Sequence, residues 1–296
     1  MPELPEVEVV RSGLEPALTG ASIIAVEVLD ARALTRHPGT AVDFEAALTG
    51  SVMDAVVRRG KFLWVPLRAR NDALLTHLGM SGQMLLRASG APRERHERVR
   101  IAVSHPRHGN LDVVFADQRT FGSLAIDTLV DTLDSAAAGS GSGRASVPSQ
   151  VAHIARDPLD PAFSDADFRL LLKKKSSGIK RVLLDQTVVS GIGNIYADES
   201  LWAARIHPET LAKDIPSPKA TELLQEVRFV LQKALAEGGT SFDAQYVNVN
   251  GQAGYFAHSL NAYGRTGDAC PRCGHPIIRL AFANRSSHFC AHCQQR

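Results

Sequence analysis

The most specific chemical pattern in the sequence is a set of four cysteines near its end. They form two Cys-x-x-Cys pairs, Cys270 with Cys273 and Cys290 with Cys293, and no cysteine precedes them. Two such pairs supply the four thiolates of a tetrahedral zinc site, and a complete sulfur shell leaves no open position for catalysis. We therefore expect one structural zinc ion. Two alternatives, a pair of disulfides and a redox pair, are disfavoured by the lack of a secretory signal and by the finger-like spacing.

The second chemical candidate is the start of the chain, where Pro2 follows Met1. Removal of Met1 would leave a secondary α-amine, whose pKa of about 7.7 to 8.0 keeps roughly one molecule in ten neutral at pH 7. Neutral amines attack carbonyl-like carbons and form Schiff bases. Glu3 and Glu6 would give such an amine an acid/base partner. The simpler interpretation is a proline that only stiffens the terminus.

Basic residues are clustered although the chain as a whole is nearly neutral. Lys and Arg number 33 against 31 Asp and Glu, which gives a formal charge of +2. The clusters are residues 58–61, 93–100, 105–108 and 173–181. Clusters of this kind neutralise phosphates, which is the main driving force of nucleic-acid binding. Any single cluster is more simply a solvated charged face, but their recurrence beside a zinc finger favours DNA or RNA as the partner.

A glycine-rich segment, residues 189–196, lies between two helical patterns. Its position predicts a tight helix-turn-helix connection rather than a dinucleotide-binding loop after a strand. Amides at the start of the next helix can point at a phosphate, and Asn194 adds a side-chain donor. A turn that serves only helix packing explains the segment equally well.

The elements that must position these groups follow from hydrophobic spacing. Apolar residues three and four apart predict a helix over 4–18, with acids in its first turn. From about residue 22 the pattern shortens to alternation, typical of antiparallel strands. Helical spacing returns with Ser164 as an N-cap, and again over about 218–237 with Ser217 as N-cap and Pro218 at the first helical position. Gly238 and Gly239 should end that helix.

Length and composition set the domain organisation. A chain of 296 residues, 44% hydrophobic and 22% charged, is expected to form globular domains, two by length. The Gly/Ser-rich stretch predicts a flexible linker or insertion. The expected parts are 1–133, 134–150, 151–262 and 263–296. With no apolar run near the roughly 18 residues of a membrane span, and no basic, apolar leader, we expect a cytoplasmic monomer that does not bind membranes.

Several of these segments, taken in order, resemble the formamidopyrimidine-DNA glycosylase family, bacterial repair enzymes for oxidised purines. The resemblance runs nearly end to end. It implies an α+β fold with an N-terminal antiparallel β-sandwich and flanking helices, then a helical helix-two-turn-helix domain with a zinc-finger β-hairpin. The segments that carry it include MPELPEVEVVRSGL, RRGKFL, LLTHLGMSGQM, FADQRTFG, IKRVLLDQTVVSGIGNIYADESLWAARIHP, GGTSFDAQY, GYFAHSLNAYGRTGDACPRCG and NRSSHFCAHCQ.

The resemblance also implies a bifunctional glycosylase and lyase acting on double-stranded DNA that contains oxidised bases. Pro2 would attack C1′ of the damaged nucleoside, and the resulting iminium would undergo β- and δ-elimination. Glu3 would donate a proton at the sugar, Lys61 would assist β-elimination, and Arg285 would serve δ-elimination. Glu6 and Glu199 are candidates for catalytic support.

Further residues correspond to DNA contacts. An enzyme that reaches a glycosidic carbon must extrude the nucleotide, and a wedge must fill the gap. Met80, Arg119 and Phe121 match the wedge, although core packing is the commoner role of a methionine or phenylalanine. The residues that match backbone-positioning roles are His96, Lys175, Lys180, Asn194 and Tyr263, with Arg119 also bonding the orphaned base.

Three features depart from the pattern or leave it open. Thr120 stands where several relatives have a basic residue, 135–146 looks like an insertion, and the loop at about 239–256 does not reveal the preferred lesion. We expect oxidised purines such as 8-oxoguanine and formamidopyrimidines as substrates. The alternatives are oxidised pyrimidines, as in the endonuclease VIII type, a non-catalytic binder of damaged DNA, and a zinc-finger regulator.

Overall fold

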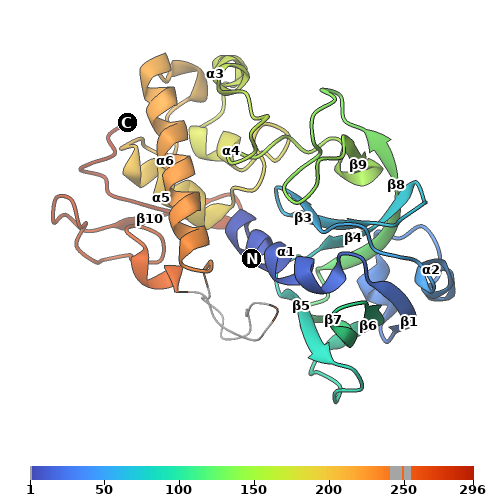
Figure 1. The fold of residues 1–296 in the computed structure, drawn as a ribbon. Helices are drawn as coiled ribbons and strands as arrows, with labels where there is room; N and C mark the ends of the chain where they lie inside the picture. Colours follow the sequence, from blue (N-terminus) through green and yellow to red (C-terminus); the bar gives the residue numbers. More distant parts are fainter. Residues whose placement is uncertain (1, 241–248, 250–254) are drawn as a thin grey trace. The chain divides into compact units, whose positions relative to one another are not determined.

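The computed structural model describes residues 2–240, 249 and 255–296. The chain forms two compact units (Figure 1). The first unit consists of residues 1–153 and 238–254, and the second of residues 154–237 and 255–296. Met1, whose removal is predicted, lies outside the described residues. So does most of the loop at 239–256. The four-part domain division remains a prediction.

The first unit contains two antiparallel sheets, as predicted. The four-stranded sheet has the order β1 (Ser22–Val28), β6 (Glu97–His105), β7 (Gly109–Asp117), β5 (Gly82–Ala88). The five-stranded sheet has the order β2 (Val57–Arg59), β3 (Phe62–Pro66), β4 (Asp72–His77), β8 (Ser123–Asp131), β9 (Ser146–Pro148). Alternate residues of β6 are buried, which is the pattern of a strand with one face in the core.

Helix α1 (Leu4–Leu18) has the bounds that the spacing of apolar residues predicts. It contacts β2 and β3 of one sheet and β6 of the other. Val10 and Leu14 lie in the same buried cluster as side chains of both sheets. The helix is therefore fixed against the core of the first unit, and its first residues are held with it.

Helix α2 (Ala41–Leu48) lies in the part of the chain where only strands were expected. Its sequence signal is a capping box: Thr40 accepts from the Asp43 amide at 3.2 Å, and the Asp43 carboxylate accepts from the Thr40 amide at 2.9 Å. A short 3₁₀-helix, Ala31–Leu34, also interrupts the strands. The hydrophobic alternation alone did not reveal either element.

The Gly/Ser-rich stretch 134–150, predicted from its composition to be a flexible linker or an insertion, forms regular structure. It belongs to the first unit, returns along β8 as strand β9 and forms an isolated bridge with β2 through Ser140 and Arg58. Ala138 is buried. Small residues here allow backbones to pack closely. The prediction from composition took the same residues as a sign of mobility. Its interpretation as an insertion stays a prediction.

The second unit is helical and ends in a two-stranded hairpin. Ser164 caps α3 (Asp165–Lys174) by accepting from the Asp167 amide at 3.1 Å, as predicted. The longest helix begins at Ser217, one residue earlier than expected, so Pro218 occupies its second position. Gly238, with φ of +75°, follows its end. The elements of the second unit are α3 (Asp165–Lys174), α4 (Ile179–Leu183), α5 (Asn194–Ala203), α6 (Ser217–Ala236), β10 (Ile278–Phe282) and β11 (Arg285–Phe289). It also has two short 3₁₀-helices, Ala212–Asp214 and Phe256–Ser259, and the first unit has a further one at Ser149–Val151.

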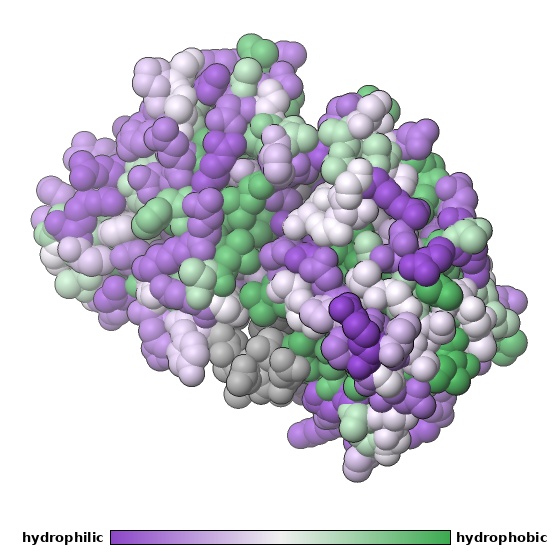
Figure 2. All heavy atoms as spheres, viewed as in Figure 1, coloured by the Kyte–Doolittle hydropathy of each residue, from purple (hydrophilic) through white to green (hydrophobic). Residues whose placement is uncertain are grey.

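The α+β fold class is therefore confirmed, with antiparallel sheets in the first unit and helices followed by a hairpin in the second. Most of the visible surface is hydrophilic, with small hydrophobic patches between the polar side chains (Figure 2). In the described part of the chain, no helix combines the length and the apolar character needed to cross a membrane.

Candidate functional site

The start of helix α1 places the predicted nucleophile and acid in a buried setting. Pro2 is buried, and Glu3, the residue before the helix, is only 2% exposed. The Glu6 carboxylate accepts from the Glu3 amide at 2.8 Å, and from the amide and hydroxyl of Thr240 at 2.8 and 2.7 Å. With three donors on its oxygens, Glu6 orients the terminus, and Glu3 is the carboxyl group next to Pro2.

Lys61 lies in the tight turn between β2 and β3. Gly60 has φ of +56°, a left-handed conformation that glycine adopts at little cost. The buried Arg58 guanidinium connects this turn to α1: its Nε donates to Glu8 at 2.7 Å, and its Nη1 donates to the Gly60 carbonyl at 3.2 Å. The turn that carries Lys61 is thus bonded to the helix that follows Pro2.

The three predicted wedge residues lie on two loops of the first unit. Met80 is 42% exposed and Phe121 is 57% exposed, so neither packs in the core. The Arg119 guanidinium lies 5.2 Å from the centre of the Phe121 ring. Exposed apolar side chains beside an arginine are suited to replace a base in a stack.

A buried carboxylate, which the sequence reasoning missed, ties these two loops together. Asp117 is 1% exposed and accepts from the Ser81 hydroxyl at 2.6 Å, the Arg119 amide at 3.1 Å and the Gly122 amide at 2.8 Å. The backbones also touch, since a Cβ on Gly79 would lie 2.4 Å from the Gly122 nitrogen. The available signal was the acid two residues before Arg119 in FADQRTFG.

His77 is a second residue that the sequence reasoning missed. Its ring packs 4.7 Å from that of Phe62, and its Nδ1 accepts from the Gly79 amide at 3.2 Å. Burial, together with the positive charges of Arg36 and Lys61, lowers the pKa of His77 to about 4. The imidazole is therefore neutral at pH 7, with its proton on Nε2 and available to an acceptor. The signal was its position three residues before Met80.

His96 lies at the turn before β6 with φ of +62°, and its carbonyl accepts from the Asp117 amide at 2.9 Å. Its side chain is half-buried. The backbone of His96 thus supports the loop of Arg119, and a DNA contact by its ring remains a prediction.

In the second unit, the structure places Lys180 in a buried ion pair, and its contact with DNA stays a prediction. Its side chain has no exposed surface, and its ammonium bonds the Asp198 carboxylate at 2.7 Å and the Ser286 carbonyl at 2.9 Å. Asn194 also donates to the Ser286 carbonyl, at 3.0 Å, while its Oδ1 is buried without a hydrogen-bond partner. Lys180 therefore fixes the β10–β11 hairpin on α4 and α5.

The structure likewise gives Glu199 a structural position, and catalytic support by its carboxylate stays a prediction. Its buried carboxylate accepts from the amides of Asn261, Ala262 and Tyr263 at 2.8–2.9 Å. The Tyr263 ring packs 4.9 Å from that of His288. Glu199 holds the turn that carries Tyr263, and contact of Tyr263 with DNA remains a prediction.

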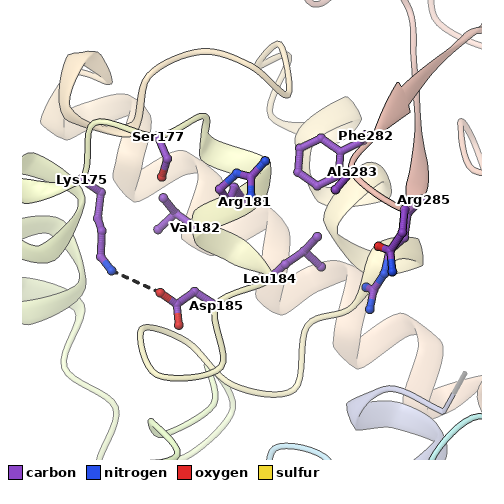
Figure 3. Close-up of a pocket in the computed structure, with 10 residues that line it drawn as sticks. Lys175, Ser177, Arg181, Val182, Leu184, Asp185, Phe282, Ala283 and Arg285 are labelled. Atoms are coloured by element: carbon purple, nitrogen blue, oxygen red, sulfur yellow. Dashed lines mark hydrogen bonds and ion pairs between the residues drawn. The ribbon is translucent and has the colours of Figure 1, made fainter.

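Arg285 and Lys175 line one pocket of about 390 Å³ between the helices and the hairpin of the second unit (Figure 3). Arg285 is exposed at the start of β11, and Arg181 lies 5.5 Å from the centre of the Phe282 ring. Lys175 makes an ion pair with Asp185 at 3.2 Å. The pocket therefore presents two arginines and a partly neutralised lysine, a set that suits a phosphate.

The four cysteines meet as the spacing predicts. Their sulfur atoms all lie within 4.8 Å of one another, close to the sulfur separations of about 3.8 Å in a tetrahedral zinc site. Burial alone would raise the pKa of Cys270, but hydrogen bonds from the Trp202 indole and from backbone amides lower it to about 6. Four sulfur ligands so close together form a complete tetrahedral shell, and the site holds one structural zinc ion with four cysteine ligands.

Buried Pro2 and Glu3 at a helix start, a basic turn bonded to that helix through Arg58, and a four-cysteine hairpin on a helical unit are typical of a zinc-bearing enzyme that acts on nucleic acid. Three family models match the chain: the formamidopyrimidine-DNA glycosylase N-terminal domain at residues 1–124, its H2TH domain at 154–245, and the zinc finger found in these enzymes and in isoleucyl-tRNA synthetase at 267–296.

Curated relatives and solved structures agree over the full length. The formamidopyrimidine-DNA glycosylase of Leifsonia xyli is 60% identical over all of both chains, and that of Thermobifida fusca is 51% identical over all of this chain and 98% of its own. The Lactococcus lactis enzyme bound to abasic-site DNA is 32% identical, has a TM-score of 0.81 and covers 99% of this chain and 100% of its own. The chain belongs to the formamidopyrimidine-DNA glycosylase family.

Proposed function

We propose that this chain removes oxidised purines from double-stranded DNA and then cleaves the strand, through a Schiff base on Pro2. The chain is a DNA glycosylase and lyase by its family. The nucleophilic amine of Pro2 attacks C1′, the damaged base leaves, and the iminium loses the 3′ and then the 5′ phosphate by successive eliminations. Each elimination breaks a C–O bond as a C–H proton is removed.

The observation that carries this proposal is the geometry at the start of α1. Pro2 and Glu3 are both buried, and Glu6 holds the Glu3 amide through a 2.8 Å hydrogen bond. A buried carboxyl group beside the amine can deliver a proton to the sugar as its ring opens. A protein that only bound DNA would have no need for this arrangement.

The remaining residues supply binding and extrusion. Met80, Arg119 and Phe121, exposed on two joined loops, would enter the stack and replace the extruded nucleotide. Lys61 would assist β-elimination, and Arg285, exposed on the hairpin, would bind phosphate for δ-elimination. We expect the chain to act as a monomer on nucleoid DNA in the cytoplasm.

Solved relatives support the substrate class. The Lactococcus lactis enzyme has been solved with DNA containing a formamidopyrimidine of guanine, at 32% identity and a TM-score of 0.81. The same enzyme has also been solved with DNA containing an oxidised pyrimidine. Oxidised pyrimidines are therefore the second candidate substrate, and oxidised purines the first.

Borohydride trapping tests the proposal. A duplex with one 8-oxoguanine opposite cytosine is incubated with the wild type, Pro2→Gly and Glu3→Gln, and the adduct is mapped by mass spectrometry. We expect an adduct on Pro2, with strand cleavage lost in Glu3→Gln. The matched control is a chain with one extra N-terminal residue, which blocks the amine while all side chains remain. An adduct on Lys61, or cleavage by the blocked chain, would contradict the proposal, and cleavage of an oxidised-pyrimidine duplex alone would favour the second candidate.

A further inference from the structure

The chain that follows β8 and ends with β9 forms a small hairpin, residues 134–148, which we call the 134–148 hairpin. The Thr132 amide donates to the Ala145 carbonyl at 2.9 Å, and the Ala138 amide to the Arg144 carbonyl at 2.8 Å. Gly139 and Ser142 form an antiparallel bridge near its tip. The hairpin lies between the segments matched by the first two family models, which end at 124 and begin at 154.

The tip of this hairpin lies against β2, the edge strand of the five-stranded sheet. Arg58 and Ser140 exchange both backbone hydrogen bonds, each at 2.9 Å. The Arg59 side chain adds a third contact, since its Nε donates to the Ala138 carbonyl at 2.6 Å. The hairpin therefore pairs with a strand edge that would otherwise be open.

Two glycines make this close approach feasible. A Cβ on Gly139 would lie 2.1 Å from the Arg58 carbonyl oxygen, and one on Gly141 would lie 2.1 Å from that of Val56. Gly141 also has φ of +100°. In contrast, a Cβ on Gly143 would meet no atom within 4 Å. Gly139 and Gly141 therefore allow the tip to contact β2 and the residue before it, whereas Gly143 takes no part in this contact.

The strand that the hairpin contacts leads directly into the turn of Lys61. Arg58 receives the hairpin on its backbone, while its guanidinium bonds Glu8 of α1 and the Gly60 carbonyl. A shift of β2 would move both the Lys61 turn and its connection to α1. Displacements of about 1 Å can reduce a catalysed rate by about a hundredfold.

We propose that the 134–148 hairpin is a positioning element for Lys61, in addition to its place in the fold. It holds the backbone of Arg58 and Arg59, and these residues set the direction of the turn that follows. This inference depends on the proposed function, because Lys61 is its point of action.

The test compares two identical substitutions, Gly139→Val and Gly143→Val, each in the wild type and in Lys61→Ala. Base release and strand cleavage are measured under single-turnover conditions with 8-oxoguanine DNA. We expect Gly139→Val to slow strand cleavage by about tenfold in the wild type and by less than about twofold in Lys61→Ala, because residues that act through one group are not additive. Gly143→Val should stay within about twofold in both backgrounds.

The folded fraction is measured separately, by the amplitude of borohydride trapping on an abasic duplex. If Gly139→Val lowers that amplitude too far, Arg59→Gln replaces it, since this variant removes the hydrogen bond to the Ala138 carbonyl without adding a side chain to the hairpin. The inference is overturned if the corrected rate equals that of Gly143→Val, or if the loss persists in Lys61→Ala. Absence of cleavage and trapping in the wild type would instead refute the proposed function.

Discussion

Asp117 shows how one side chain can fix a recognition surface. Its carboxylate accepts from Ser81 on one wedge loop and from the Arg119 and Gly122 amides on the other. Each wedge residue is exposed and has few contacts of its own, so the loop geometry depends on these bonds. We therefore expect the proposed wedge to depend on a buried carboxylate that holds both loops.

Asp117→Asn should therefore weaken both folding and wedge function. The side-chain amide of this variant would place an NH₂ group against backbone N–H donors. A buried donor without an acceptor lowers the free energy of unfolding by about 1–3 kcal/mol. We expect urea unfolding to show a loss of this size, and 2-aminopurine fluorescence to show reduced extrusion of the nucleotide. Asp131→Asn, at an exposed position in β8, is the control and should change neither measurement. Normal extrusion in the Asp117 variant would contradict this role.

His77 gives a pH dependence whose sign can be worked out. Its pKa is about 4 in the folded chain, because burial and the charges of Arg36 and Lys61 oppose protonation, against about 6.5 when unfolded. Between these values the unfolded chain binds more protons, so stability falls as pH drops from 6.5 towards 4. The full loss is on the order of 3 kcal/mol.

Unfolding in urea at pH 7.5 and pH 4.5, for the wild type and His77→Gln, measures this contribution. We expect His77→Gln to lose less stability than the wild type over this range. Equal losses in the two proteins would show that His77 does not titrate as described. Each protein is compared with itself at the two pH values. The change in stability that the substitution causes at pH 7.5 therefore does not enter the comparison.

At the scale of elements, the sequence predicts those helices whose apolar residues repeat with a helical period or whose first residue is a typical cap. Helix α1 and the cap at Ser164 came from local patterns and agree with the structure. Helix α2 has too few turns for a clear period, and only its Thr40–Asp43 capping box marks it. The 134–148 hairpin was not predicted for another reason. Composition cannot distinguish a glycine that makes a segment mobile from a glycine that lets it fit closely against a neighbouring backbone.

Site residues divide in the same way. The chemistry expected of Pro2 and the cysteines came from residue type and spacing, whereas the role expected of Lys61 came from the family resemblance. Lys180 could not be placed from the sequence, because its counterion Asp198 lies on another helix and its other partner, Ser286, on the distant hairpin. A cationic run such as 173–181 predicts a surface charge, and only tertiary contacts show which of its lysines is buried.

The contact between α4, α5 and the β10–β11 hairpin should depend on the Lys180–Asp198 pair. Lys180→Met leaves a buried carboxylate without its counterion, which typically costs about 3–5 kcal/mol. We expect lower thermal stability and weaker DNA binding, since Arg285 lies on the hairpin that Lys180 holds. Binding is measured by fluorescence anisotropy with an abasic duplex.

Lys174→Met is the matched control, because Lys174 lies on the surface of α3. We expect it to unfold like the wild type, and its DNA affinity to change only by the loss of one surface charge. Full stability in Lys180→Met would show that the buried pair contributes nothing to the hairpin. Loss of affinity without loss of stability would restore Lys180 as a direct DNA contact.

At the scale of the whole molecule, a nearly neutral net charge does not show how the charges are distributed between the interior and the surface. Many acids are used inside the fold: Glu97 and Asp112 hold Arg100, and Asp198 holds Lys180. In contrast, Arg119 and Arg285 stay exposed at the proposed DNA-contacting positions. A net charge of +2 therefore understates the field that a phosphate backbone meets.

The two tryptophans report separately on the two units when zinc is removed. Trp202 donates to the Cys270 sulfur at 3.4 Å in the second unit, whereas Trp64 is buried in β3 of the first. Because zinc supplies folding energy to a segment with a small core, a chelator should unfold the finger, change Trp202 emission and lower DNA affinity by at least about tenfold. Trp202→Phe should abolish the emission change, and Trp64→Phe should preserve it. Undiminished DNA binding by the zinc-free chain, or a chelator response in Trp202→Phe, would show that the metal does not act through the finger alone.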